Sequence, residues 1–243
     1  MIEEPYRWLE AIGNRREYVQ EQLKGGSPVF AVSLADGILL LGVGTGNSKV
    51  FELFDRHALA GLGHPADIEK IRQAAIDAAH TEAFTRAPED VSLRRLVGFG
   101  LSPQLKTNFE QIFSAPFLVE LLLAEVAPSP EQDLLVRLHF DGGFQLTTKR
   151  IALAVARSDA EATAQDWLTD LPKRTDRTEV INLLLQAWWC LVENKPFAEI
   201  SETDRRTGWR SALEGKVVEI GWLARSSTRA ARFSMLSLAD VGL

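Results

Sequence analysis

The spacing of apolar residues changes early in the chain. From Tyr6 to Lys24 apolar residues recur among charged ones, as on an amphipathic surface helix, and Gly25-Gly26 provides the usual helix stop. Residues 29–34 and 38–41 are then short apolar runs around Asp36-Gly37, a pair typical of hairpin turns. After a glycine-rich bend, residues 49–54 and 57–62 predict a second strand pair. We therefore expect four strands before the next long helix.

The rest of the chain alternates helical regions with groups of strands. Residues 65–83 have apolar side chains at helical spacing, and residues 88–113 form a second amphipathic stretch that Gly98, Gly100 and Pro103 should kink or break. Further elements are predicted as strands at 117–126, 134–140, 151–155, 217–223 and 232–236, helices at 160–171 and 179–192, and a polar, mobile loop at 200–208. Strand runs and helix pairs are segregated, which favours α+β layers over an alternating βαβ fold.

Composition narrows the class of protein. The 243 residues are 46% hydrophobic and 25% charged, as in a globular protein with a sizeable core, and the net charge of −6 argues against a protein that coats nucleic acid. Cys190 is the only cysteine, which excludes an internal disulfide and a cysteine-rich zinc site. No apolar run is long enough to span a membrane, and the acidic start is unlike a signal peptide. We expect a cytoplasmic protein with no membrane or nucleic-acid partner, no cofactor and no metal.

Several patterns suggest chemistry only weakly. Gly42, Gly44 and Gly46 follow a strand, but a strand rather than a helix is predicted next, so a dinucleotide site is not indicated. The four histidines (His57, His64, His80 and His139) lack metal-ligand spacing and a strong motif with a nearby acid, so we interpret them as surface or packed residues. Trp188-Trp189 is interpreted as core or interface packing. The basic group Arg225, Arg229 and Arg232 is interpreted as a solvated face.

Short motifs in a defined order point to one family. They are Glu17-Tyr18 with Gly26-Ser27, the hairpin 35–40, Lys49-Val50-Phe51-Glu52-Leu53-Phe54-Asp55-Arg56, the strand 117–126, and Leu138-His139-Phe140-Asp141-Gly142. Together with the element order, these motifs resemble a proteasome core-particle subunit and are closest to the bacterial α-type subunits. The resemblance covers most of the chain.

The resemblance implies a fold and a role. It implies a four-layer αββα sandwich of the N-terminal-nucleophile hydrolase type, formed by residues 1–243 as a single domain, with residues 1–26 as the N-terminal α-type helix. It further implies a non-catalytic subunit that forms a ring with like subunits for assembly, gating and activator docking in protein degradation. The implied partners are β-type proteasome subunits and an ATPase activator.

The proteolytic β-type subunits of the family suggest an alternative. They use a processed N-terminal threonine with a lysine and an aspartate, and here Ser27 and Lys49 match the threonine and the lysine. A freed Ser27 could act as a self-processing hydrolase nucleophile with its own amine as base. However, the aspartate position falls in Gly42-Val43-Gly44, which has no carboxylate, and the predicted N-terminal helix would keep Ser27 inside the chain.

Lys49 has a second interpretation from the same resemblance. In α-type subunits the matching lysine receives the C-terminal carboxylate of an activating ATPase, and a lysine ammonium suits that group. The wall of this pocket would continue at Gly63 and His64, where His64 departs from the usual leucine. Two other interpretations remain open: Lys49 merely begins a strand and points to solvent, or the chain forms a ring scaffold without a proteolytic partner.

Overall fold

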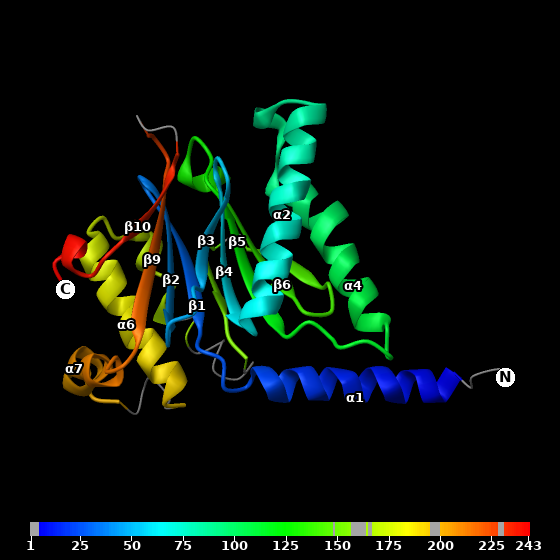
Figure 1. Cartoon of the computed structure of the whole chain (residues 1–243). Helices are drawn as coiled ribbons and strands as arrows, with labels where there is room; N and C mark the ends of the chain where they lie inside the picture. The colour runs from blue at the N-terminus through cyan, green and yellow to red at the C-terminus, as the bar shows by residue number, and fades with distance from the viewer. Residues whose placement is uncertain (1–4, 148, 157–163, 165–166, 195–199, 228–230) are drawn as a thin grey trace.

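The computed structural model of the chain describes residues 5–147, 149–156, 164, 167–194, 200–227 and 231–243 (Figure 1). The first half contains α1 (Pro5–Leu23), β1 (Val29–Leu34), β2 (Gly37–Gly44), β3 (Val50–Phe54), β4 (His57–Gly63), α2 (Pro65–Thr85), α3 (Leu93–Arg95), the π-helix η2 (Leu96–Leu101) and α4 (Ser102–Glu110). The second half contains β5 (Val119–Glu125), β6 (Leu134–His139), β7 (Phe144–Thr147), β8 (Ile151–Ala154), α6 (Arg177–Val192), α7 (Glu202–Ala212), β9 (Val217–Ala224) and β10 (Phe233–Leu236).

The described strands form two five-stranded antiparallel sheets. The first sheet has the order β10-β9-β2-β1-β8, and the second has the order β3-β4-β5-β6-β7. Figure 1 shows α6 and α7 beside the first sheet, α2 and α4 beside the second sheet, and α1 extending away along one end of the strands. The α+β organisation in four layers, αββα, is thus confirmed.

Side-chain alternation on the strands produces separate cores. On the paired strands β1 and β2, Phe30 and Leu41 pack toward α6, whereas their neighbours Ala31 and Leu40 pack toward the second sheet. The core between the sheets contains several alanines, among them Ala58 and Ala60 on β4. A third core fills the space between the second sheet and α2 and α4. Because successive side chains of a strand point to opposite faces, each central strand contributes one face to the core between the sheets and the other face to a core beneath the helices.

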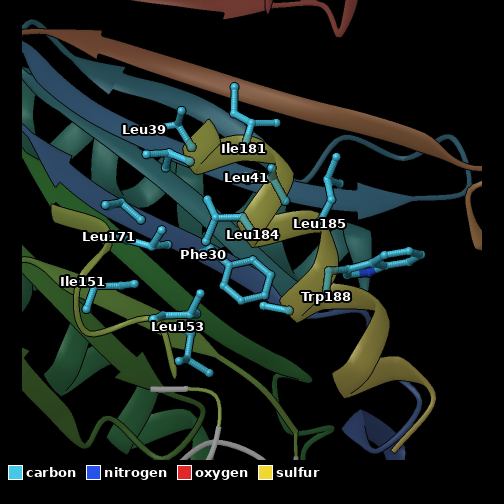
Figure 2. Packing of buried hydrophobic residues seen from close by; sticks show 14 of the residues in the cluster. Phe30, Leu39, Leu41, Ile151, Leu153, Leu171, Ile181, Leu184, Leu185 and Trp188 are labelled. Carbon is cyan, nitrogen blue, oxygen red and sulfur yellow. The ribbon is translucent and has the colours of Figure 1, made fainter. Parts of the chain in front are cut away.

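Helix α6 supplies a continuous apolar stripe to the first sheet. Ile181, Leu184, Leu185 and Trp188 recur at helical spacing, and Figure 2 shows them beside Phe30 and the other labelled sheet residues. Each of these four side chains is at most 1% exposed. Full burial of a side chain of this size stabilises the fold by roughly 1.5 to 3 kcal/mol. This contact fixes α6, and with it Trp188, against the sheet.

Most predicted strands lie where the sequence placed them, but the glycine-rich bend does not. Gly42 and Gly44 continue β2 and pair with Glu219 and Val217 of β9, so the predicted bend at these glycines is wrong. The chain turns only afterwards, at Thr45–Asn47. Glycine suits this part of β2 because the side chain of Lys49 crosses it, about 3.2 Å from where a Cβ of residue 42 would stand.

The interrupted second helix is confirmed. After α3 the backbone widens into the π-helix η2, which contains both Gly98 and Gly100, before α4 begins at Ser102. Half of the predicted helix at 160–171 lies outside the described residues, and at its end Leu171–Lys173 forms a short 3₁₀ turn.

The predicted polar loop at 200–208 is wrong, because α7 occupies Glu202–Ala212. The hydroxyl of Ser201 caps this helix by accepting a hydrogen bond of 3.1 Å from the N–H of Asp204. Trp209 is 3% exposed and packs into the core beside α6. The segment therefore forms a helix despite its polar composition, because its N-terminus is capped and Trp209 packs into the core.

The predicted solvated basic face is wrong for Arg225. Its guanidinium donates to both carboxylate oxygens of Asp133, at 2.7 and 2.8 Å, and to the carbonyl of Leu34 at 2.9 Å. The side chains of Arg225 and Asp133 are 10% and 1% exposed. Because Arg225 follows the first sheet and Asp133 precedes β6 of the second, this pair joins the two sheets. Arg229 lies outside the described residues.

Candidate functional site

Lys49 is fixed at the start of β3 by a carboxylate from the other sheet. Both oxygens of Glu219, on β9, accept hydrogen bonds from the backbone N–H of Lys49 at 3.1 and 2.9 Å, and one also accepts from Val50 at 3.1 Å. The Lys49 side chain turns back toward residue 27, where its Nζ lies 3.4 Å from the carbonyl oxygen of Ser27. Lys49 does not simply point into solvent: burial lowers the pKa of its ammonium, and the charge of Glu219 opposes that shift.

Ser27 lies in the continuous segment between α1 and β1. Its Oγ accepts a hydrogen bond of 2.8 Å from the indole Nε1 of Trp188 on α6. The preceding Gly26 packs directly on Leu62, since a Cβ at position 26 would stand 2.7 Å from Leu62 Cδ2. The hydroxyl that matches a nucleophile therefore joins the α6 layer to the start of β1.

Ser27 and Lys49 line a cavity of about 390 Å³ at the end of the strands that faces α1. The other described lining residues are Gly25, Gly26, Val43, Gly44, Thr45, Asn47, Ser48, Gly63, Pro65, Ile68, Trp188, Val192 and Lys216. These fifteen residues include two lysines and no carboxylate. In a chain with a net charge of −6, this cavity is a local site of positive charge.

Gly63 and His64 occupy different positions relative to this cavity. Gly63 lines it at the end of β4, with φ of +132° and with the carbonyl oxygen of Leu118 only 1.9 Å from where a Cβ would stand. His64 does not line the cavity. Its Nδ1 accepts a hydrogen bond of 3.3 Å from the N–H of Ala66 and caps α2. The structure thus brings together Lys49, Gly63 and Ser27, and places His64 beside them in a capping role.

Sequence reasoning missed three residues of this site. Lys216 and Glu219 lie at the start of β9, and the bond between Lys49 and Glu219 joins residues 170 positions apart. Trp188 was recognised as a packing residue, but not as the donor to Ser27. The sequence offered one indication of this hydrogen bond, since a buried tryptophan usually finds an acceptor for its N–H.

Two of the remaining histidines, His57 and His139, each lie beside a glutamate on the adjacent strand. His57 is fully buried, with Nε2 3.6 Å from Glu125, and His139 Nδ1 lies 2.9 Å from Glu120. Each acid stands opposite its histidine on the adjacent strand, so sequence spacing could not reveal it. Within the described ranges no three His, Cys, Asp or Glu side chains are grouped to hold a metal ion. In the same ranges no helix has both the length and the apolar character of a membrane span.

Two stacked antiparallel sheets between helix layers form a four-layer αββα sandwich with Ser27 and Lys49 at one end of the strands. This is the arrangement that the resemblance to the N-terminal-nucleophile hydrolase type implies. No family model matches the chain. Proteins named proteasome subunit alpha from several bacteria are similar to it. The one from Paenarthrobacter aurescens (strain TC1) is 34% identical over 134 residues, which cover 53% of this chain and 55% of the relative. The one from Actinosynnema mirum is 33% identical over 135 residues, which cover 55% of this chain and 51% of the relative.

The third relative, from Arthrobacter sp. (strain FB24), is 29% identical over 234 residues, which cover 93% of this chain and 89% of the relative. In the first two comparisons the chain spans about half the length of the relative, whereas here it spans most of it. The resemblance to bacterial α-type proteasome subunits is confirmed.

Proposed function

We propose that this chain is a non-catalytic α-type subunit of a proteasome-like particle. In this proposal residues 1–243 are one proteasome-subunit-like domain in the cytoplasm that forms a ring with like subunits and supports assembly and gating. The similarity over 93% of the chain to a protein named proteasome subunit alpha supports the class. β-type subunits and an ATPase activator are the proposed partners.

The surroundings of Ser27 support the proposal that this subunit is not catalytic. Its hydroxyl is engaged by Trp188, and the described residues that line the cavity include no carboxylate to hold Lys49 for catalysis. Chain continuity through Gly25, Gly26 and Ser27 leaves no free amine to serve as the base. The site therefore suits binding better than acyl transfer.

Native mass spectrometry of the purified chain, alone and mixed with a β-type subunit, tests this proposal. We expect the full 27.0 kDa chain in a closed ring that also captures the β-type subunit. A chain that begins at Ser27 would instead support the self-processing serine hydrolase. A full-length ring that never binds a β-type subunit would support the scaffold without a proteolytic partner.

We further propose that Lys49 and Gly63 receive the C-terminal carboxylate of the activator, with His64 holding the adjacent helix start. A short peptide with a free C-terminus should bind, and the same peptide with an amidated C-terminus should not. Lys49→Met removes the ammonium at nearly constant side-chain length and should weaken binding roughly tenfold or more, since a charge-assisted hydrogen bond contributes about 1.5 to 3 kcal/mol. Lys173→Met is the matched control, because the side chain of Lys173 is 77% exposed and is not part of the described cavity lining.

A further inference from the structure

The cavity beside Ser27 contains more positive charge than one terminal carboxylate requires. Lys49 lines it from the start of β3 and Lys216 from the start of β9. The described lining contributes no Asp or Glu to balance either of them. Two cations in one cavity whose described lining has no carboxylate favour a ligand with two negative charges.

The ammonium of Lys49 has N–H donors that the described residues do not engage. An ammonium has three donors, and the one bond found for Lys49 Nζ among the described residues is the weak contact of 3.4 Å with Ser27. The nearest carboxylate, Glu219, directs its oxygens to the backbone N–H groups of Lys49 and Val50 instead. A partly buried cation in this state gains from an anion that enters the cavity.

Lys216 stands at the rim of the same cavity. It is exposed, and its Nζ lies 5.7 Å from the centre of the Trp188 ring and donates to the carbonyl of Ala212 at 2.6 Å. No carboxylate pairs with it within the described part of the chain. Trp188 therefore adjoins both cations, Lys216 through its ring and Lys49 through Ser27, which both Trp188 and Lys49 contact.

Apolar side chains complete the lining of this cavity. Val43, Ile68, Trp188 and Val192 all contribute to the lining. An extended peptide advances about 3.3 to 3.6 Å per residue, so a cavity of about 390 Å³ has room for only the last few residues of a chain. Two carboxylates inside it must then come from neighbouring positions of one tail.

We propose that Lys216 is a specificity-determining residue of this pocket, which selects peptide tails that carry an acidic side chain next to the C-terminal carboxylate. The terminal carboxylate pairs with Lys49, and the acidic side chain of the next-to-last residue pairs with Lys216. This inference rests on the proposed docking function of Lys49.

Calorimetric titration of the full chain with four N-acetylated peptides tests the inference. The peptides are identical except for Glu or Gln at the next-to-last position and a free or amidated C-terminus. The free-acid Glu peptide should bind the unmodified protein about fivefold more tightly than the free-acid Gln peptide, as for a partly exposed ion pair. Lys216→Met should abolish this preference and leave the affinity for the Gln peptide unchanged. Lys173→Met should preserve the preference.

The two hypotheses fail in different ways. If Lys49→Met leaves the binding of both free-acid peptides intact, the docking site itself is wrong. If Lys49→Met weakens both peptides but the Glu preference is absent, or survives Lys216→Met, only the role of Lys216 is wrong. If inorganic phosphate binds as tightly as the Glu peptide with the same dependence on Lys216, the pocket is a general anion site and selectivity for acidic tails is refuted. Unchanged melting temperatures of the variants confirm that folding is not the cause.

Discussion

Replacement of Arg225 by leucine tests whether its ion pair with Asp133 stabilises the packing of the two sheets, a role referred to below as the clamp. The mutation removes the guanidinium that joins Asp133 to the carbonyls of Leu34 and Ala35, at 2.9 Å each. Asp133 stays behind with a side chain that is 1% exposed, held by the hydroxyl of Ser33 at 2.7 Å and the N–H of Ala127 at 2.8 Å. A buried carboxylate without its cation is the main cost of this change.

The expected magnitude follows from burial. Removing one partner of a buried ion pair costs about 3 to 5 kcal/mol. For a chain of this size, each kcal/mol lowers the melting temperature by roughly 2 to 4 °C, so Arg225→Leu should melt about 10 °C lower. The double variant Arg225→Leu with Asp133→Leu removes the stranded charge, and its loss should be smaller than the sum of the two single losses by about 2 kcal/mol or more.

Thermal and denaturant unfolding of the four proteins measures these values in the same oligomeric state. Arg206→Leu serves as the control, because its ion pair with Glu202 is solvent-exposed and contributes about 0.5 kcal/mol or less. A loss below about 1 kcal/mol for Arg225→Leu, or strictly additive single losses, would refute the clamp. Since this pair is not part of the cavity lining, peptide binding by the folded variant should stay unchanged.

Two further predictions concern the cavity. Gly63→Ala should lower the free energy of unfolding by about 2 kcal/mol or more, because φ at Gly63 is +132° and the new Cβ would overlap the Leu118 carbonyl. The control Gly13→Ala, in open space on α1, should be neutral or slightly stabilising. Equal melting temperatures for the two variants would contradict this argument. Carboxylate-tail affinity should fall as pH rises through the lowered pKa of Lys49, at a pH below the ordinary lysine range, because only the ammonium attracts the carboxylate. Lys49→Arg, which stays charged, should bind the tail with no such fall, whereas an affinity decline in both proteins would assign the effect to another group.

The layers of the fold could be predicted from local patterns, and the exceptions have physical reasons. Residues 29–34 and 57–62 alternate or cluster apolar side chains strongly enough to define strands. Helix α7 was missed because Gly208 lowers its intrinsic helix propensity and its many charged residues leave no apolar periodicity. In the structure Gly208 allows close packing, since a Cβ there would stand 2.5 Å from the Trp189 ring. That contact comes from α6, and no local pattern encodes it.

The candidate site was predictable only in part. Ser27, Lys49 and Gly63 were found through short motifs of the family that the chain resembles, and they do line one cavity. Lys216 reaches it, and Glu219 reaches the backbone of Lys49, only because β9 pairs with β2, a contact between distant segments of the chain. Arg225 was assigned to solvent because its partner Asp133 lies on the other sheet. Charged residues are thus hard to place from sequence when their partners come from another layer.

The contact between Lys49 and Ser27 has a consequence for the integrity of the chain itself. Cleavage after Gly26 would convert the amide nitrogen of Ser27 into a primary amine, which is largely protonated at neutral pH. This new cation would appear on the residue whose carbonyl lies 3.4 Å from Lys49 Nζ, in a cavity that also contains Lys216. The new ammonium and that of Lys49 would then repel each other. Cleavage at this point would therefore carry an electrostatic cost that the intact chain does not have.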